Sequence, residues 1–288
     1  MSNFLNSFDK NSFLYKFLKK NLPTRFKSYI FFIRDFYKNI KLKIPKFILS
    51  KCITNVKNRE GKNIYTMRNL GGSTAVRGLN MFTSDPEVTE WIDKFPKNSS
   101  LLDIGANVGV YSLYAAHLSH NVIALEPESL NFACLNLNIK DNNFDNKITA
   151  YPFCAYDREM VSHLNLKVMK FGGSGNSFAR NITENGEEFK PIYKQGSIST
   201  TVDKFLTNID IKEVNFIKID VDGNELNVIN GMTKLLKTET LKSIHIELNP
   251  NFIEHKHVFE ILNQVGFQKP IKHTWFKGQD VFNYTFNR

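Results

Sequence analysis

The chain has 288 residues, of which 42% are hydrophobic and 23% charged, so it can form a packed core and does not resemble a disordered protein. Its net charge of +10 is concentrated in residues 1–57, which hold 13 Lys or Arg and 2 Asp or Glu and leave 25 basic and 26 acidic residues for the remainder. A basic face on the folded domain is therefore not expected, which excludes nucleic acid as the predicted partner. The three cysteines are widely spaced and match neither a disulfide framework nor a zinc site, which favours the cytoplasm: Cys52, Cys134 and Cys154.

Residues 1–60 form a basic, aromatic segment that we expect to be a helical extension. Apolar residues recur there at helical spacing between lysines: Phe13, Leu14, Phe17 and Leu18. Two interpretations stay open, since the apolar face could pack on the protein or a partner chain, or residues 1–45 could contact the inner face of an anionic membrane. The apolar stretch at 29–33 is far shorter than the roughly 20 residues that a transmembrane helix needs.

From residue 100 onward, strand patterns alternate with helix patterns. This order predicts an α/β domain over residues 61–288, with a parallel sheet covered on both faces. The predicted strands are 100–104, 121–125, 148–155, 214–219 and 243–248, and the predicted helices are 108–118, 129–139 and 225–236. Residues 160–200 interrupt the alternation with a half-exposed strand pattern and a glycine-rich loop at 171–177, which predicts a β-hairpin insertion near the site.

The strongest motif is a glycine loop that directly follows the first of these strands. It contains Asp103, Gly105, Ala106, Asn107 and Gly109. Glycine lets the backbone turn tightly and approach a ligand, and the spacing differs from the G-x-G-x-x-G pattern that binds a dinucleotide pyrophosphate. S-adenosylmethionine (SAM) has no phosphate, so we expect Asp103 to lie near its ammonium group and the loop amides near its carboxylate.

A second motif ends the next strand at Glu126 and Pro127. An acid at this position can accept hydrogen bonds from both ribose hydroxyls of an adenosine, as it does in NAD enzymes, so the motif does not choose the cofactor alone. Pro127 cannot donate to a strand ladder, and the strand must therefore stop beside the glutamate.

A third motif places Asp220, Asp222 and Glu225 after another apolar strand, at the sheet edge where ligands bind. Clustered carboxylates repel each other, so one could have a raised pKa and act as a base, or Asp220 and Asp222 could hold a divalent cation. The structural alternative is that Asp222 or Asn224 caps the following helix, with Glu225 in its first turn.

A fourth, weaker set lies on one side of the strand at 243–248, where residues alternate between faces. It consists of His245, Glu247 and Asn249, and His245 is more typical of a structural residue than of a base. His117, within a predicted helix, is interpreted as structural.

Taken together, the motifs resemble the FkbM family of SAM-dependent methyltransferases over roughly residues 80–250. The resemblance rests on residues 103–112, on Glu126 and Pro127 with Asn131, on 201–203, on 218–225 with Gly231, and on Glu247. Asp222 stands where the family usually has Glu. The resemblance implies a Rossmann-like seven-stranded sheet, SAM bound by the glycine loop and Glu126, Asp157 near adenine, and Asp203 as a brace.

The resulting hypothesis is SAM-dependent O-methylation, with a sugar hydroxyl of a glycan, a glycolipid or a related small molecule as the expected target. A hydroxyl is a weak nucleophile, so we expect Asp220, with Glu225 or Glu247, to assist as a base. Two alternatives remain at this stage: an NAD-dependent oxidoreductase on the same fold, and a non-catalytic adaptor with an inactive methyltransferase fold. The sequence does not indicate the oligomeric state.

Overall fold

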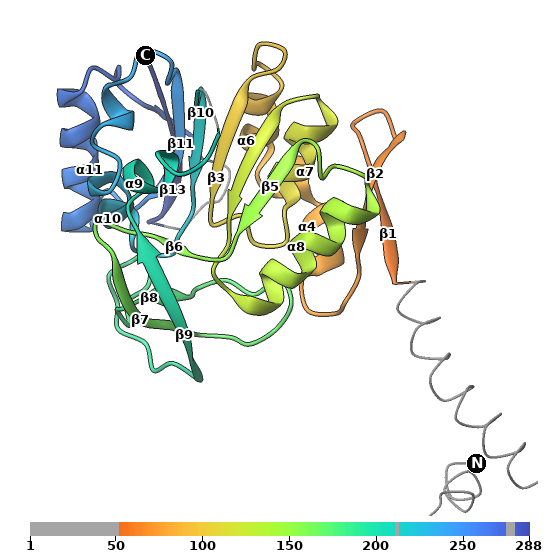
Figure 1. The fold of residues 1–288 in the computed structure, drawn as a ribbon, viewed down its shortest axis with the longest axis horizontal. Coiled ribbons are helices and arrows are strands. Elements are labelled where there is room, and N and C mark those ends of the chain that lie inside the picture. The colour runs from red at the N-terminus through yellow and green to blue at the C-terminus, as the bar shows by residue number, and fades with distance from the viewer. Residues whose placement is uncertain (1–51, 211–212, 275–279) are drawn as a thin grey trace, which may run out of the picture. The chain divides into compact units, whose positions relative to one another are not determined.

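A computed structural model describes residues 52–210, 213–274 and 280–288, and Figure 1 shows their arrangement. The helices predicted within residues 1–51 lie outside the described residues. Thr54–Arg288 forms one compact unit. Its first element, strand β1 (Ile53–Lys57), falls inside the segment expected to be helical, and Val56 of this strand is buried in the core. The division of the chain at residue 60 stays a prediction.

The central feature is a seven-stranded sheet with the order β12-β13-β11-β10-β3-β4-β5. Neighbouring strands from β11 to β5 are parallel, and β13 runs antiparallel to both β11 and β12. The strands are β3 (Ser100–Ile104), β4 (Asn121–Leu125), β5 (Ile148–Tyr151), β10 (Phe216–Ile219), β11 (Ser243–Leu248), β12 (Ile271–Lys272) and β13 (Phe282–Asn287). The predicted Rossmann-like α/β sheet is confirmed.

The direction of the chain through the sheet reverses between β3 and β10. The chain steps outward from β3 to β5 on one side and from β10 to β11 on the other. Ligands in open α/β sheets bind outside the carboxyl ends of the strands at such a switch point. The register pairs Asp103 with Lys218, so the loops that follow β3 and β10 lie next to each other.

Two helical layers cover the sheet because β3 and its neighbours are buried on both faces. Leu101 packs with Trp91, Leu113 and Leu135 on one face, whereas Leu102 packs with residues of the other face. The first layer contains α6 (Pro86–Ile92), α7 (Val110–His117) and α8 (Ser129–Asp141). The second contains α9 (Val202–Leu206), α10 (Glu225–Asn230) and α11 (Ile253–Gln264). Figure 1 shows α8 and α11 on opposite sides.

The predicted hairpin insertion is present as part of a four-stranded sheet with the order β6-β9-β7-β8. Strands β7 (Met160–Leu166) and β9 (Tyr193–Thr200) pair antiparallel along their length, and the short β6 (Cys154–Ala155) and β8 (Ser177–Phe178) complete it. The strand predicted at 148–155 is therefore wrong as one element. The chain leaves the central sheet after β5, passes Pro152, and enters the insertion sheet at β6.

The helix predicted at 225–236 is also too long, because α10 ends at Asn230. The next residue, Gly231, lies so close to the backbone that a Cβ there would be 2.0 Å from the Tyr156 carbonyl oxygen. A separate 3-10 turn, Leu235–Lys237, follows.

The remaining elements precede the sheet: β2 (Asn63–Arg68), which pairs with β1, α4 (Thr74–Leu79) and α5 (Met81–Ser84). Within the described ranges, no helix is long and apolar enough to span a bilayer.

Candidate active site

The glycine loop at residues 105–109 has the backbone conformation that only small residues tolerate. Gly105 has φ +81°, and a Cβ on it would lie 1.8 Å from the Asp220 carbonyl oxygen. Gly109 has φ +89°, and a Cβ there would lie 2.4 Å from a Leu135 methyl carbon. The loop therefore packs directly against the turn that follows β10, with no side chain between the two backbones.

Glu126, at the end of β4, is held by backbone amides. One carboxylate oxygen accepts a hydrogen bond from the N–H of Asn107 at 2.7 Å, and the other accepts from the N–H of Glu128 at 2.8 Å. Burial raises the pKa of Glu126 to about 8, although these two N–H groups favour its ionised form. The residue is oriented as the sequence predicts for a ribose-binding acid, with further lone pairs on both oxygens.

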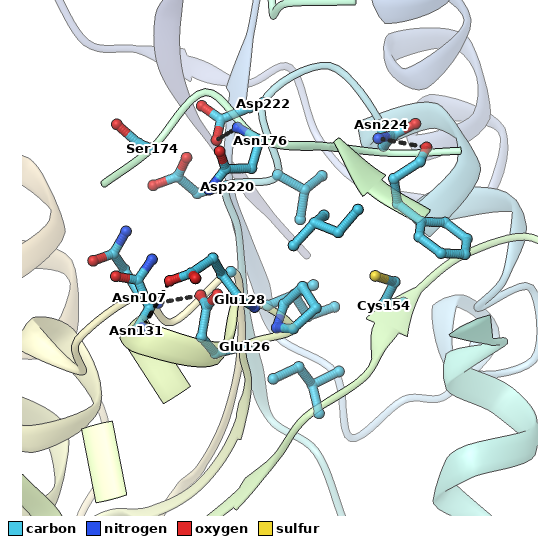
Figure 2. Close-up of a pocket in the computed structure, with 18 of the residues that line it drawn as sticks. Asn107, Glu126, Glu128, Asn131, Cys154, Ser174, Asn176, Asp220, Asp222 and Asn224 are labelled. Atoms are coloured by element: carbon cyan, nitrogen blue, oxygen red, sulfur yellow. Dashed lines mark hydrogen bonds between the residues drawn. The ribbon is translucent and has the colours of Figure 1, made fainter. Parts of the chain in front are cut away.

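The main cavity opens between the glycine loop, Glu126 and the insertion sheet, and has a volume of about 710 Å³, part of it open to solvent. Figure 2 shows Asp220 and Asp222 across this cavity from Glu126. Its apolar lining comes from β4, the 152–155 segment and the insertion: Leu125, Phe153, Ala155, Leu164 and Phe178. Apolar and aromatic walls with a few fixed polar groups are typical of a nucleoside site.

Four predicted cofactor residues, Asp103, Ala106, Gly109 and Asp157, do not line this cavity, although Ala106 lines a neighbouring one. Asp103 is 1% exposed, and one oxygen accepts from the Ser112 hydroxyl at 2.6 Å, while the other has no partner in the structure. Burial raises its pKa despite nearby Lys218. Asp157 accepts a hydrogen bond from the Asn227 amide at 3.0 Å. The structure thus gives no support to the expected contact of Asp157 with adenine, because Asp157 is bonded to α10 and lies outside the lining of the main cavity.

Lys218 and Asp220 form an ion pair where β10 ends. The Lys218 ammonium lies 3.0 Å from a carboxylate oxygen of Asp220 and 5.3 Å from the centre of the Tyr111 ring. Burial favours the neutral form of both groups, but their mutual attraction outweighs it, so the pKa of Lys218 is raised and that of Asp220 is lowered. Since a low pKa makes a weak base, Asp220 is better suited to stabilise positive charge than to accept a proton.

Asp222 neither caps α10 nor faces a metal site. It has φ +53°, and one of its oxygens accepts from the backbone N–H of Gly175 at 2.8 Å and of Asn176 at 3.3 Å. Burial, followed by the charge of Asp220, raises the pKa of Asp222 to about 7. Asn224 is the N-cap of α10 and Glu225 lies in its first turn, as the structural alternative expected, but Asn224 makes no side-chain capping bond, so the capping interpretation is wrong for Asp222 and holds only in position for Asn224.

The loop at residues 171–176, which we call the strap, is tied to several elements beside the main cavity. Asn107 donates to the Gly173 carbonyl at 2.8 Å, and Asn131 of α8 donates to the same oxygen at 3.0 Å and accepts from Gly172 N–H at 2.8 Å. Arg77 of α4 donates to the Gly172 carbonyl at 2.9 Å. Together with Asp222, these bonds join the strap to both halves of the sheet.

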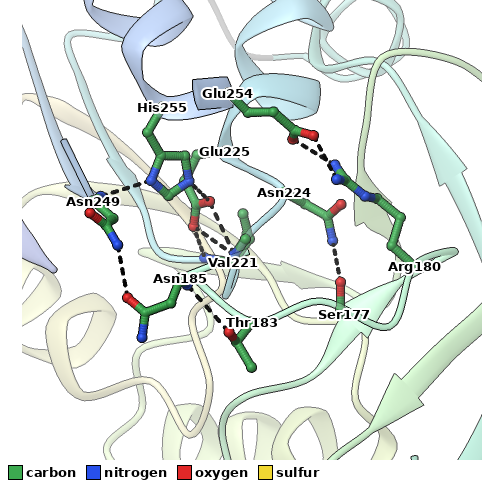
Figure 3. Close-up of polar contacts among 11 residues, drawn as sticks. Ser177, Arg180, Thr183, Asn185, Val221, Asn224, Glu225, Asn249, Glu254 and His255 are labelled. Atoms are coloured by element: carbon green, nitrogen blue, oxygen red, sulfur yellow. Dashed lines mark hydrogen bonds and ion pairs between the residues drawn. The ribbon is translucent and has the colours of Figure 1, made fainter. Parts of the chain in front are cut away.

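Glu225, predicted as a catalytic residue, is fully buried and bonded within the protein. Its oxygens accept from the backbone N–H of Gly223 at 3.1 and 3.2 Å, and the imidazole of His255 lies 2.8 Å away (Figure 3). The other ring nitrogen of His255 accepts from Asn249 N–H at 2.7 Å, which places the proton on the nitrogen that faces Glu225. Glu225 thus braces the turn at residues 220–224, which we call the acidic turn, and it lines neither the main cavity nor the two other cavities that Asp220 lines, so the catalytic prediction for it is not supported.

Glu247 lies instead in a second, polar cavity that we call the acidic pocket, with a volume of about 1210 Å³, part of it open to solvent. Six carboxylates line it: Asp85, Glu184, Asp220, Asp222, Glu247 and Asp280. Burial, followed by the charges of Asp220 and Asp222, raises the pKa of Glu247 well above its ordinary value. The described residues offer Glu247 no hydrogen-bond partner, so its carboxylate is free to accept a proton from a ligand.

The predicted divalent cation gains no support from the arrangement of donors. Among the residues that the structure describes, no group of three or more His, Cys, Asp or Glu side chains could hold a metal ion. Asp220 is paired with Lys218, and Asp222 is bonded to the strap.

The weaker predictions concern residues that serve the framework. His245 is 1% exposed and contacts Thr285 at 2.9 Å within the sheet. Asp203 accepts from the backbone N–H of Lys234 at 2.8 Å and of Leu235 at 2.9 Å, so it braces the turn after α10.

Arg77 lines the main cavity and the acidic pocket but was not predicted from the sequence, because a single arginine in an unpatterned segment carries no motif.

Fold and site together define an α/β protein with a nucleoside-type cavity at the switch point of its sheet. Residues 103–269 match the family model described as the methyltransferase FkbM domain. The chain belongs to this family. Strand β13 also separates β11 from β12, unlike the order of the dinucleotide-binding fold, which argues against the NAD alternative.

Similar proteins include "Methyltransferase 1" of Beauveria bassiana (strain ARSEF 2860), which is 27% identical over 151 residues. That match covers 48% of this chain and 60% of the relative. The crystal structure of a methyltransferase FkbM from Methylobacillus flagellatus KT is 15% identical with a TM-score of 0.45, covering 68% of this chain and 44% of that one. The METTL16 MTase domain is 14% identical with a TM-score of 0.46, covering 87% and 91%.

Proposed function

We propose that this protein transfers the methyl group of SAM to a hydroxyl oxygen of a small molecule, with a sugar or glycan as the acceptor class. The observation that carries the proposal is that the main cavity and the acidic pocket share Asp220 and Asp222. A donor in the first cavity and an acceptor in the second would therefore meet at the carboxyl end of β10.

The residues of the main cavity fit the nucleoside part of SAM. The two fixed oxygens of Glu126 suit a ribose diol, and the apolar wall suits an adenine ring. When bound, SAM supplies an electrophilic methyl group on a positively charged sulfur. The carboxylate of Asp220 stays ionised beside Lys218 and lines both cavities. It would stabilise this positive charge where the two cavities meet.

Glu247 is the residue that we assign as the general base. Methyl transfer forms a carbon–oxygen bond as the carbon–sulfur bond breaks, and the acceptor hydroxyl must lose its proton. The raised pKa of Glu247 and its lack of a partner among the described residues suit that task better than the ion-paired Asp220.

The lining of the acidic pocket bears on the acceptor. Its six carboxylates would repel a phosphate or an acidic sugar close to the reaction centre, whereas hydroxyl groups can donate hydrogen bonds to them. A neutral polyol fits this chemistry. Repulsion of phosphates also agrees with the expectation that nucleic acid is not the partner, which rests on the nearly balanced charge of residues 58–288.

Two measurements test the proposal. Calorimetry should show binding of SAM and of S-adenosylhomocysteine but not of NAD, and a screen of nucleotide sugars, neutral oligosaccharides and lipid-linked glycans with SAM should yield a product heavier by one CH₂ group. Absence of binding to both SAM and S-adenosylhomocysteine at millimolar concentration would contradict the methyltransferase activity and favour the non-catalytic adaptor.

A further inference from the structure

A third cavity, which we call the side cavity, adjoins the glycine loop and has a volume of about 780 Å³. It shares Arg77, Gly105, Asn107 and Asp220 with the main cavity and reaches Asp85 as well. Because the two cavities adjoin at the glycine loop, the side cavity would receive the amino-acid part of SAM if Glu126 held its ribose.

Acidic side chains outnumber basic ones around the main cavity and equal them in number around the side cavity. Glu126, Glu128, Asp220 and Asp222 line the main cavity, and Asp85 and Asp220 line the side cavity. These carboxylates suit the ammonium and the sulfonium of SAM, but they repel its carboxylate. A carboxylate in such a partly buried place is strongly disfavoured unless a cation meets it.

Two cations in the described residues line the side cavity, and Lys218 is poorly placed to serve. It is 4% exposed, its ammonium is bonded to Asp220 at 3.0 Å, and the nearby carboxylate of Asp103 also raises its pKa. A second anion at Lys218 would have to compete with both carboxylates.

Arg77 is less occupied, because its charge also contributes to the low pKa of Asp220 but the two side chains form no hydrogen bond among the described residues. It lines the main cavity, the side cavity and the acidic pocket, and its Nε donates to the Gly172 carbonyl at 2.9 Å, which fixes the plane of the guanidinium. Its two terminal nitrogens have no hydrogen-bond partner within the described part of the chain. A guanidinium held in this way presents a fork of N–H donors that matches a carboxylate.

We propose that Arg77 binds the carboxylate of the methionine part of SAM. The inference rests on the proposed function and assigns a cofactor contact to a residue that lies outside the glycine loop and outside the matched family region. It also gives α4 and the strap a role in cofactor binding, since both fix the position of Arg77.

The test compares two ligands that differ in the amino-acid part. S-adenosylhomocysteine carries the carboxylate, whereas 5′-methylthioadenosine has the same nucleoside thioether without it. Calorimetry on the full chain should show that Arg77→Gln weakens S-adenosylhomocysteine binding by about 10- to 100-fold, the usual effect of a lost charge-assisted hydrogen bond, and leaves 5′-methylthioadenosine binding within about twofold. Arg77→Lys should recover part of the loss.

Asn131→Ala is the matched control, because Asn131 also anchors the strap at Gly172 and Gly173 but carries no charge. It should change the affinity for both ligands by the same factor. Equal weakening of both ligands by Arg77→Gln would overturn the proposal and reduce Arg77 to a strap anchor, and unchanged binding of both would overturn it too. If the unaltered protein bound 5′-methylthioadenosine but not S-adenosylhomocysteine, the carboxylate contact would fail while the nucleoside site survived; binding of neither would remove the proposed function itself.

Discussion

Two carboxylates that share the acidic pocket have opposite pKa shifts because their neighbours differ. Asp220 is paired with the ammonium of Lys218, which lowers its pKa, whereas Glu247 is buried beside other acids, which raises its pKa. The ordinary pKa values of Asp and Glu differ by less than one unit, so environment alone separates an anion that stabilises positive charge from an acid that can take up a proton.

Replacing Glu247 tests this division of roles. Glu247→Gln should lower turnover by about 100-fold or more, because no base then takes the proton from the substrate hydroxyl. The affinity for S-adenosylhomocysteine should stay within a few-fold. In the unaltered protein, turnover should rise with pH as Glu247 ionises, and this acid limb should disappear in the variant. Steady-state kinetics and calorimetry provide the two measurements.

The matched control is Glu184→Gln, which removes another carboxylate from the same pocket. It should change the KM for the acceptor more than the turnover number. A similar loss of turnover in both variants would contradict a specific role for Glu247 and would point to the overall charge of the pocket instead.

Glu126 makes cofactor binding depend on pH. Its pKa of about 8 lies above its ordinary value, so the free protein holds the proton at pH 7, whereas a ribose diol needs the ionised acceptor. Affinity for S-adenosylhomocysteine should therefore rise with pH up to about 8, with release of a proton on binding at pH 7. Calorimetry in buffers of different ionisation enthalpy measures that proton; a pH-independent affinity with no proton release would show that Glu126 is ionised throughout.

At the scale of elements, the acidic turn after β10 is the structural link between the sheet, α11 and the strap. Glu225, bonded to His255 of α11, accepts a hydrogen bond from the backbone of this turn, and Asp222 accepts one from the backbone of the strap. The third motif therefore combines Glu225, which supports the framework, with Asp220 and Asp222, which line the cavities. This mixture explains why the catalytic prediction does not hold for every acid of the motif.

Removing His255 should destabilise the protein more than it impairs chemistry. His255→Ala leaves the buried carboxylate of Glu225 without a donor, which should lower the free energy of unfolding by about 2–4 kcal/mol. Glu254→Ala, next to it on α11, breaks a partly exposed pair with Arg180 and should cost about 1 kcal/mol or less. Denaturant unfolding measures both; a loss of turnover without loss of stability in His255→Ala would restore a catalytic role for Glu225.

Asp222 should oppose folding increasingly as the pH rises. Its folded pKa of about 7 exceeds its ordinary value near 4, so the folded state binds the extra proton, and stability is lost as pH rises from about 4 to 7. Asp222→Asn keeps an oxygen for the strap amides and tolerates the positive φ, and it cannot ionise. The variant should melt several degrees above the unaltered protein at pH 8 and at nearly the same temperature at pH 4, where Asp222 is protonated in the folded protein. A difference that is equal at the two pH values would contradict the assignment.

At the scale of the whole molecule, the sequence predicted the centre of the sheet better than its surroundings. Strands β3, β4 and β11 have the predicted bounds, because β3 and β4 are short, mostly apolar runs buried on both faces and β11 alternates apolar with polar residues. The β5–β6 break at Pro152 and the end of α10 at Gly231 depend on contacts between distant segments, which a local pattern does not contain. The glycine loop and Glu126 were predicted from contiguous motifs.

The acidic pocket could not be predicted in the same way. Asp85, Glu184 and Glu247 come from three separate parts of the chain and meet only in the folded protein. Likewise, Arg77 reaches the site through a bond to the strap, and no spacing in the sequence relates the two.

The basic N-terminal segment provides a prediction for the whole chain. Residues 1–57 hold 13 basic and 2 acidic residues, so the full chain should sediment with vesicles that contain anionic lipids, and less so as salt is added. A chain that begins at residue 52 should lose this binding and keep its affinity for S-adenosylhomocysteine within about twofold, since that affinity depends on the unit Thr54–Arg288. Equal sedimentation of both chains would contradict membrane contact through the segment.

The close approach of Gly105 to the Asp220 carbonyl has a practical consequence for redesign. Because the main chains of the glycine loop and of the turn after β10 are in contact there, the sheet sets the distance between the bound methyl donor and the reacting oxygen. Exchanging side chains cannot adjust this distance. Acceptor preference should instead be altered at Glu184 and Asp280, which line the acidic pocket but neither the main cavity nor the side cavity. Libraries restricted to these two positions should yield variants with new acceptors and unaltered binding of the methyl donor.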